Sequence, residues 1–253
     1  MKKILCFLFS LFIIVSCEKR KQESIELEQD IEISNDSLKE VEITTLDTIK
    51  SKIPKQLLSS IEKDYKDKQY IIIDFYLGLI DNNETEDAVV IIQEKDKSSE
   101  ISESILVYQN ISNSYVLMAH NRSLITEEYY FSSDEPTNGS KEIEIKDHYI
   151  KIRMFCYGPC GNTFLDFKFE NDDILLINFS TYDIGAGSQI EQEYDVENDI
   201  VKIITTNTMT DDMEVTEEEF AFNYSKGKSI RFIDLNTKDL FKALINLESK
   251  NIL

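Results

Sequence analysis

Tryptophan is absent from this 253-residue sequence, and glycine and proline are scarce, with seven and three residues. So few and scattered glycines provide no glycine-rich loop that could cradle phosphate groups, and no Gly-x-Ser-x-Gly turn that would expose a catalytic serine. The only imidazoles belong to His120 and His148, so a zinc site would need further ligands. The sequence therefore gives little support for nucleotide-dependent, nucleophilic or zinc-dependent catalysis.

Basic residues are also few. The chain has 27 lysines and arginines against 48 aspartates and glutamates, which gives a formal net charge of −21. A field of this sign repels nucleic acid and anionic lipid headgroups. It attracts a basic protein or a cation. The alternative interpretation is an acidic surface that serves only solubility. We therefore expect no nucleic-acid partner.

The apolar run at the N-terminus, residues 4–15, is too short to span a membrane as a helix. Two lysines precede this run and a small residue, Ser16, follows it. The order of basic, apolar and small residues is typical of a secretory signal peptide. The end of this segment, Ile14-Val15-Ser16-Cys17, resembles the lipobox of bacterial lipoproteins.

The resemblance to lipoproteins implies that residues 1–16 are removed as a signal peptide. It also implies that Cys17 carries a diacylglycerol group and becomes the first residue of the mature chain. The protein would then be exported and anchored by its lipid in a Gram-negative cell envelope, and we expect the outer membrane rather than the inner one. An ordinary export signal followed by an unmodified cysteine is the alternative.

Two of the four cysteines remain once Cys6 leaves with the signal and Cys17 is acylated. The remaining pair, Cys156 and Cys160, would lie in an oxidising compartment, and the glycine and proline between them bend the backbone. We therefore predict a structural disulfide between Cys156 and Cys160. A redox role is the alternative, but three residues separate these cysteines instead of the two of thioredoxin-like motifs.

The mature chain is predicted to consist of an acidic tether, residues 17–53, and a single β-rich domain, residues 54–253. The tether offers few apolar residues for a core. Its alternating Ile25, Leu27, Ile31 and Ile33 leave open an edge strand instead.

The domain is predicted to begin with a short helix, because Pro54 suits a first helical turn and Leu57 and Ile61 give one apolar side. From Tyr70 onward the apolar residues alternate with a period of two, and short turns rich in Asn and Asp separate about ten predicted strands. The predicted strands are residues 70–77, 88–93, 104–109, 114–119, 142–145, 149–157, 162–169, 174–182, 189–194, 200–206, 217–224 and 229–232.

Two of these strands carry specific expectations. The nearly continuous β-branched and aromatic run of residues 70–77 predicts a strand buried on both faces. Residues 217–224 and 229–232 are predicted to pair as a hairpin over Lys226-Gly227. A final helix is expected after the cap Asn236-Thr237. The fold class is therefore mainly β, an antiparallel meander or sandwich with a short helix before it and a helix after it.

The segment from Gly78 to Val90 resembles the Asp-x-Asn-x-Asp-Gly-x-x-Asp loops of FG-GAP and VCBS-type repeats, which lie between two strands and often bind calcium. Exported lipoproteins whose β domain carries one degenerate loop of this kind look similar to this chain over most of its length. The resemblance implies Asp81, Asn83 and Asp87 as metal ligands. Glu84 occupies the glycine position, so we expect only weak Ca²⁺ binding, or a hairpin turn that has lost its metal.

Aromatic and acidic residues provide the remaining candidate sites. Tyr129, Tyr130 and Phe131 form either a recognition loop or part of the core, because tyrosines are frequent in both settings. Neighbouring acids such as Asp172 and Asp173 are too numerous in this chain to identify a catalytic carboxylate pair.

These observations predict a lipid-anchored, non-catalytic binding module for an envelope protein or a glycan, without a cofactor other than weakly bound Ca²⁺. One alternative is an immunity or inhibitor lipoprotein that neutralises a basic toxin or hydrolase, which the strong acidity would suit. The other alternative is a hydrolase that uses carboxylates, so the sequence leaves enzymatic activity open.

Overall fold

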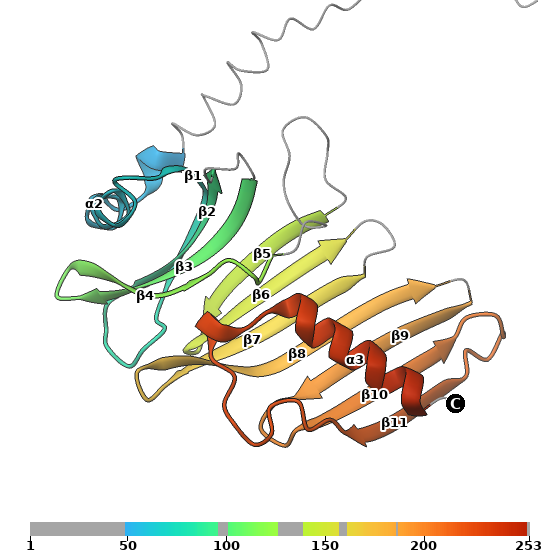
Figure 1. Cartoon of the computed structure of the whole chain (residues 1–253). Coiled ribbons are helices and arrows are strands. Elements are labelled where there is room, and N and C mark those ends of the chain that lie inside the picture. Colours follow the sequence, from blue (N-terminus) through green and yellow to red (C-terminus); the bar gives the residue numbers. More distant parts are fainter. Residues whose placement is uncertain (1–48, 96–100, 126–138, 157–160, 186, 252–253) are drawn as a thin grey trace, which may run out of the picture. The chain divides into compact units, whose positions relative to one another are not determined.

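The computed structural model describes residues 49–95, 101–125, 139–156, 161–185 and 187–251. All of them belong to one compact unit, residues 41–253. Within it, eleven antiparallel strands form two sheets, with a short helix before the strands and a longer helix after them (Figure 1). This confirms the predicted fold class.

The elements are α2 (Lys55–Asp64), β1 (Gln69–Gly78), β2 (Asp87–Lys95), β3 (Ile101–Ile111), β4 (Ser114–Asn121), β5 (Gly139–Lys146), β6 (Tyr149–Cys156), β7 (Asn162–Glu170), β8 (Asp173–Gly185), β9 (Ser188–Asp195), β10 (Ile200–Asn207), β11 (Val215–Ala221), the 3₁₀ helix η2 (Phe232–Asp234) and α3 (Thr237–Asn251).

Both sheets are meanders in which each strand pairs with its neighbours in the sequence. The four-stranded sheet has the order β1-β2-β3-β4, and the seven-stranded sheet has the order β11-β10-β9-β8-β7-β6-β5. Three of the connections are two-residue turns in which both residues have positive φ, as type I′ hairpins require. These turn residues are Ser112 and Asn113, Asp147 and His148, and Asn171 and Asp172. The predicted Asn- and Asp-rich turns are therefore confirmed.

Helix α2 covers one face of the four-stranded sheet. Leu57 and Ile61 lie on one side of the helix, Tyr65 follows the helix end at the same spacing, and all three are buried. They form one apolar cluster with side chains of β2 and β3 such as Val90 and Leu106. Residues before α2 contribute too, because Ile49 and Ile53 pack into the same cluster.

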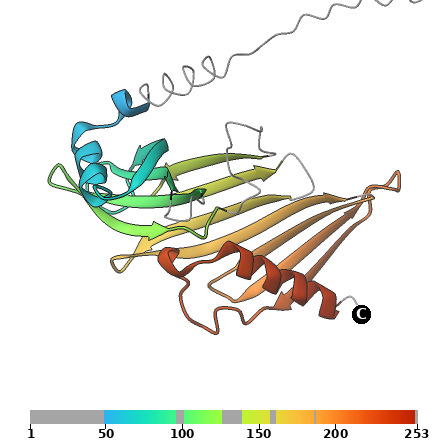
Figure 2. The same cartoon turned by 45° about the horizontal axis from the view of Figure 1, so that its top comes forward.

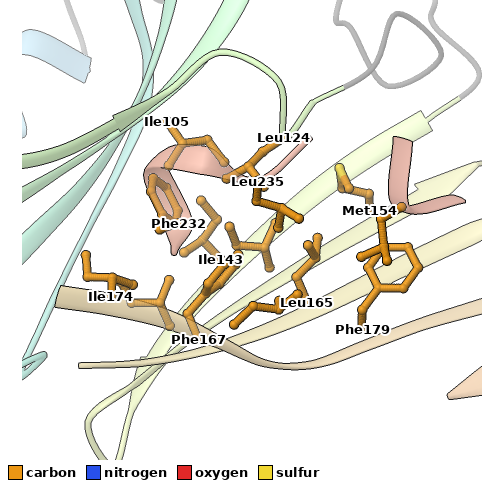
Figure 3. Close-up of a cluster of buried hydrophobic side chains, with 14 of the residues drawn as sticks. Ile105, Leu124, Ile143, Met154, Leu165, Phe167, Ile174, Phe179, Phe232 and Leu235 are labelled. Carbon is orange, nitrogen blue, oxygen red and sulfur yellow. The ribbon is translucent and has the colours of Figure 1, made fainter. Parts of the chain in front are cut away.

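The other face of the four-stranded sheet packs against the seven-stranded sheet (Figure 3). Ile105 of β3 meets inward-facing residues of β5 to β8, including Ile143, Leu165 and Phe167, in the main core of the protein. The ring of Phe232 in η2 closes this core against Phe167, with centroids 5.1 Å apart in an edge-to-face arrangement. The fold is thus a sandwich of two sheets, with α2 as an additional outer layer.

Gly78, at the end of β1, permits a close approach between the two sheets. A Cβ atom added there would lie 2.7 Å from the Cβ atom of Ile145 in β5. Contacts this short do not occur between real side chains, so only glycine fits where β1 meets β5.

Helix α3 lies over the β8 to β11 region of the same inner face (Figures 1 and 2). Its buried Leu240 and Leu244 join the main core. The side chain of Asn236 accepts a hydrogen bond from the Asp239 amide at 3.2 Å, which confirms the predicted cap.

Two predictions about individual strands were wrong. β1 is the edge strand of its sheet and is mostly half-buried, whereas β2 and β3, at the centre, are buried on both faces. The segment 229–232 does not pair with β11. Arg231 instead forms an isolated bridge with Leu175, and the Leu176 amide donates to the Ile230 carbonyl at 2.8 Å. The physical reason is that β9 pairs with β8 only from Asn178 onward, which leaves the start of β8 free for another segment.

Candidate functional site

The seven-stranded sheet has an outer face that no described helix or strand covers. On β6, Ile150, Ile152 and Met154 are buried in the core, so the intervening side chains point to the opposite face. The antiparallel register carries this alternation across β5 to β11. We call the surface formed by these outward side chains the outer face.

The part of the outer face over β9, β10 and β11 is strongly acidic. Five outward carboxylates lie on β9 and β11, and the single charged side chain that β10 presents between them is Lys202. We call these five residues the acidic patch: Glu191, Glu193, Asp195, Glu217 and Glu219.

Lys202 compensates only part of this charge. Its Nζ atom lies 2.9 Å from the Glu217 carboxylate, and its backbone lies opposite Glu193 and Glu219. The hydrogen bond that Lys202 donates to Glu217, together with the neighbouring acids, raises the pKa of Lys202, as expected of an ammonium group among carboxylates. Glu191 lies opposite Ile204, an apolar residue, so no cation stands beside it in that cross-strand row.

The outward residues of β5 to β8 are balanced in charge by comparison. Arg153 binds Asp166 with an N–O distance of 2.6 Å and lies over the Phe164 ring, 5.6 Å from its centroid. Glu142 faces Arg153 across the β5–β6 pair, and Glu144 faces Lys151. The charge of the outer face is therefore concentrated over β9 to β11.

The loop from Asp81 to Asp87 brings the three predicted metal ligands together, but protein donors occupy their oxygens. The Asp81 carboxylate accepts from the Asn83 amide at 2.8 Å, from the Asn83 side chain at 2.7 Å and from Gln109 at 2.6 Å. The Asn83 carbonyl oxygen in turn accepts from the Thr85 amide at 2.7 Å. These bonds of Asn83 and Thr85 lie within the loop, and the bond from Gln109 joins the loop to β3.

Asp87, the last residue of this loop, accepts most of the backbone hydrogen bonds that hold the loop in place. It is fully buried, and its carboxylate accepts backbone N–H groups from Asn110 at 2.8 Å, Ile80 at 2.9 Å and Asp81 at 3.2 Å. Burial raises the pKa of Asp87 above its usual value, although the three N–H donors favour the charged form. The described residues contain no group of three or more His, Cys, Asp or Glu side chains arranged to hold a metal ion. Weak Ca²⁺ binding at Asp81, Asn83 and Asp87 remains a prediction.

No protein-family model, curated protein or solved structure matches this chain.

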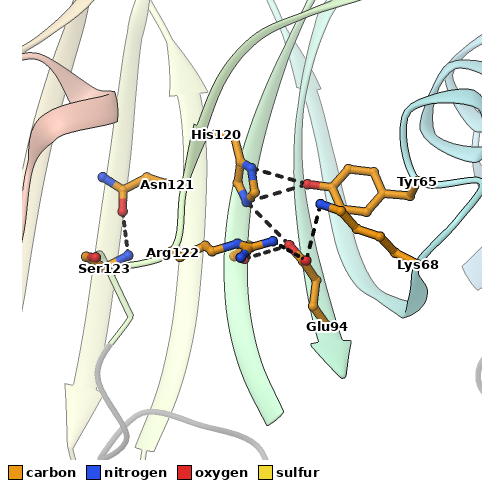
Figure 4. A network of polar contacts seen from close by, with 8 residues as sticks. Tyr65, Lys68, Glu94, His120, Asn121, Arg122 and Ser123 are labelled. Carbon is orange, nitrogen blue, oxygen red and sulfur yellow. Dashed lines mark hydrogen bonds and ion pairs between the residues drawn. The ribbon is translucent and has the colours of Figure 1, made fainter. Parts of the chain in front are cut away.

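Glu94, near the end of β2, forms a buried polar network that the sequence analysis did not identify (Figure 4). Its side chain is only 6% exposed, and it forms ion pairs with Arg122 and, at 3.6 Å, with Lys68. Ser104 donates a hydrogen bond to the same carboxylate at 3.2 Å. Removing a partner from a buried charge of this kind is costly, so the network fixes the end of β2 against β3 and against Arg122, which follows β4.

His120, in β4, is half-buried and belongs to this network. Its Nε2 atom lies 3.4 Å from Glu94 Oε1, and its Nδ1 atom lies 3.4 Å from the Tyr65 hydroxyl. Burial lowers the pKa of His120, and the attraction of Glu94 does not overcome this effect. A pKa below the usual value favours the neutral form of the ring at pH 7.

A second buried acid, Glu103 of β3, forms an ion pair with Lys141 of β5 and so connects the two sheets. Glu103 is fully buried, and the Lys141 side chain is 6% exposed. Burial lowers the pKa of Lys141, while Glu103 opposes this effect. Glu94 lies on the same face of β2 as Val90 and Ile92, and Glu103 lies on the same face of β3 as Ile105 and Val107. Because both strands are buried on both faces, no alternation in the sequence marks these acids.

Several predicted sites lie outside the described residues. They are the lipidation site Cys17, the second cysteine of the predicted disulfide, Cys160, and the aromatic loop residues Tyr129, Tyr130 and Phe131. Cys156 ends β6, and its pairing with Cys160 stays a prediction. Among the described helices, none is both long and apolar enough to cross a membrane.

Proposed function

We propose that this protein is a lipid-anchored, non-catalytic binding protein of the cell envelope, and that its acidic patch binds a basic partner protein. The observation that carries the proposal is the concentration of five outward carboxylates on β9 and β11 against Lys202 alone. The anchor rests on the lipobox-like end of the signal segment, Ile14 to Cys17.

The geometry of the sheet suits recognition of positive charge. Neighbouring strands lie about 4.8 Å apart, so carboxylates on β9 and β11 stand roughly 10 Å from one another with β10 between them. Like charges at this range repel, and a basic surface placed over the outer face would relieve that repulsion. The net charge of −21 would also accelerate the approach of a basic partner.

The buried carboxylates support a binding role over a hydrolytic one. Asp87 is held by three backbone N–H groups, Glu94 by Arg122 and Lys68, and Glu103 by Lys141. Each of these acids already stabilises the fold, so none is a free carboxylate that faces a substrate. An inhibitor of a basic toxin or hydrolase is one form that the proposed binding protein would take.

The test compares two double variants that remove equal charge from the same sheet. Glu191→Gln with Glu193→Gln neutralises part of the acidic patch, whereas Glu142→Gln with Glu144→Gln neutralises β5, where basic residues lie opposite. The full-length lipidated protein in detergent is used to capture partners from envelope extract, and the affinity of each purified partner is then measured. We expect the patch variant to weaken binding about two- to thirtyfold, and the β5 variant to leave it unchanged.

Salt provides the second measurement. Binding through the acidic patch should weaken as ionic strength rises through about 0.15 M, where the screening length falls to about 8 Å. A partner that binds equally well at high salt and to both double variants would contradict the proposal. Capture of a glycan by the β6 to β8 side of the outer face, where Phe155 and Phe164 lie edge to face, would favour carbohydrate recognition instead.

A further inference from the structure

Strand β11 is an open edge of the seven-stranded sheet. The Asn207 amide donates to the Glu214 carbonyl and the Phe222 amide donates to the Asp199 carbonyl, both at 2.8 Å. In an antiparallel ladder this pattern alternates, so even-numbered residues of β11 exchange hydrogen bonds with β10. The N–H and C=O groups of the odd-numbered residues, 215, 217, 219 and 221, therefore point away from the sheet.

No described segment pairs with that side of β11. The other sheet ends differ, because β5 contacts β1, and β4 contacts α2 and η2. Along β11 every residue except Phe220 is exposed. An exposed strand edge with unused backbone groups is a template for another strand.

The side chains along this edge determine which charge an added strand must carry. Glu217, Glu218 and Glu219 are consecutive, so two of them point to the outer face and one to the inner face. Both faces of an added strand would thus meet carboxylates. A second copy of β11 would place acid against acid, which destabilises cross-strand pairs, whereas lysine and arginine would be stabilised there.

We propose that β11 accepts an extended, lysine- or arginine-rich segment of the partner as an additional strand of the sheet. This inference rests on the proposed function and specifies how the basic partner binds. Backbone hydrogen bonds to residues 215, 217, 219 and 221 hold the segment, and the three glutamates select its charge.

The probe is a labelled ten-residue peptide of alternating lysine and threonine, with a glutamate–threonine peptide as the control. Its binding to the full-length protein is compared for Glu217→Gln and Glu217→Pro. Both changes remove the same charge, but only proline removes an N–H group that points to the open edge, and the bond to β10 does not use that group. We expect Glu217→Gln to weaken binding about two- to fivefold, and Glu217→Pro to weaken it at least about tenfold.

Amide hydrogen exchange gives a readout that does not depend on a variant. Binding of the lysine–threonine peptide should slow exchange at the amides of residues 215, 217, 219 and 221, and leave residues 216, 218 and 220 unchanged. If the peptide binds without this odd-numbered protection, and both Glu217 variants behave alike, the inference about the edge is overturned while the acidic patch keeps its role. If the wild-type protein does not bind the peptide at low salt, the inference about the edge is also overturned. The proposed function is then still tested separately, by the capture experiment. Odd-numbered protection that grows with protein concentration in the absence of peptide would instead identify a second copy as the occupant, and would likewise overturn it.

Discussion

Asp87 is the last residue of the Asp81 to Asp87 loop. Its replacement by asparagine removes one hydrogen-bond acceptor and one charge and preserves the shape of the side chain. In the native structure, Oδ1 accepts from Asn110 at 2.8 Å, and Oδ2 accepts from Ile80 at 2.9 Å and from Asp81 at 3.2 Å. An amide has a single oxygen, so its NH₂ group must face at least one of these N–H donors. The best rotamer keeps the two bonds at Oδ2 and loses the bond from Asn110.

The expected cost follows from these three bonds. A hydrogen bond to a charged group contributes about 1.5–3 kcal/mol, and a buried donor without a partner costs about 1–3 kcal/mol. The two retained bonds become weaker because their acceptor is neutral. Removal of the buried charge offsets part of this loss, since burial already raises the pKa of Asp87. We expect the free energy of unfolding to fall by about 2–4 kcal/mol.

Urea unfolding measures this change through the transition midpoint, with the slope unchanged. The control is Glu84→Gln, which removes the same charge from an exposed position in the same loop and should change stability by less than about 0.5 kcal/mol. If Asp87→Asn is as mild as Glu84→Gln, the carboxylate does not hold the loop and the reasoning is refuted.

Three further predictions concern the anchor, the half-buried His120 and calcium. Cys17→Ser should abolish incorporation of a labelled fatty acid, and a mutant that is still labelled would disprove the lipobox interpretation. Because burial lowers the pKa of His120 below its usual value of 6.5, the unfolded chain binds a proton there more readily. Stability should therefore fall as the pH is lowered through 6.5, and His120→Gln should show a shallower decline in pH-dependent unfolding, whereas identical slopes would contradict the assignment. Calcium at 1 mM should add no more than about 1.4 kcal/mol if the dissociation constant lies in the range of roughly 10⁻⁴ to 10⁻³ M; calorimetry that finds micromolar affinity, lost in Asp81→Ala, would disprove this.

The sequence predicted most of the fold because its signals are local. Alternating apolar residues mark the strands, and short polar pairs such as Asn171 and Asp172 adopt the left-handed backbone that tight hairpins need. The final helix followed from Asn236, whose side chain caps it. Each of these features depends on residues that are close together in the chain.

The errors concern contacts between distant segments. Residues 229–232 bridge to the start of β8, a position that is open only because β9 ends its pairing at Asn178. The burial of β1 depends on its place at the edge of the sheet, and strand composition alone does not determine sheet order. Both errors arise because each strand was predicted from its own residues, without its pairing partners in the sheet.

The sequence predicts only part of the candidate site. Outward glutamates on β9 and β11 can be read from the alternation around Tyr194 and Phe220, but whether another element covers them depends on the packing of the whole sheet. The buried acids Glu94 and Glu103 find their cations, Arg122 and Lys141, on other strands. Only the three-dimensional structure brings these pairs together.

The most direct test of the acidic patch as a binding surface is photocrosslinking in living cells. A photoreactive phenylalanine analogue is introduced into the full-length protein at Ile204, which lies between Glu191 and Glu217, and separately at Glu144 on β5. We predict that position 204 crosslinks to a basic envelope protein and that position 144 does not. Crosslinks to that protein from position 144 and none from position 204 would contradict the proposed function.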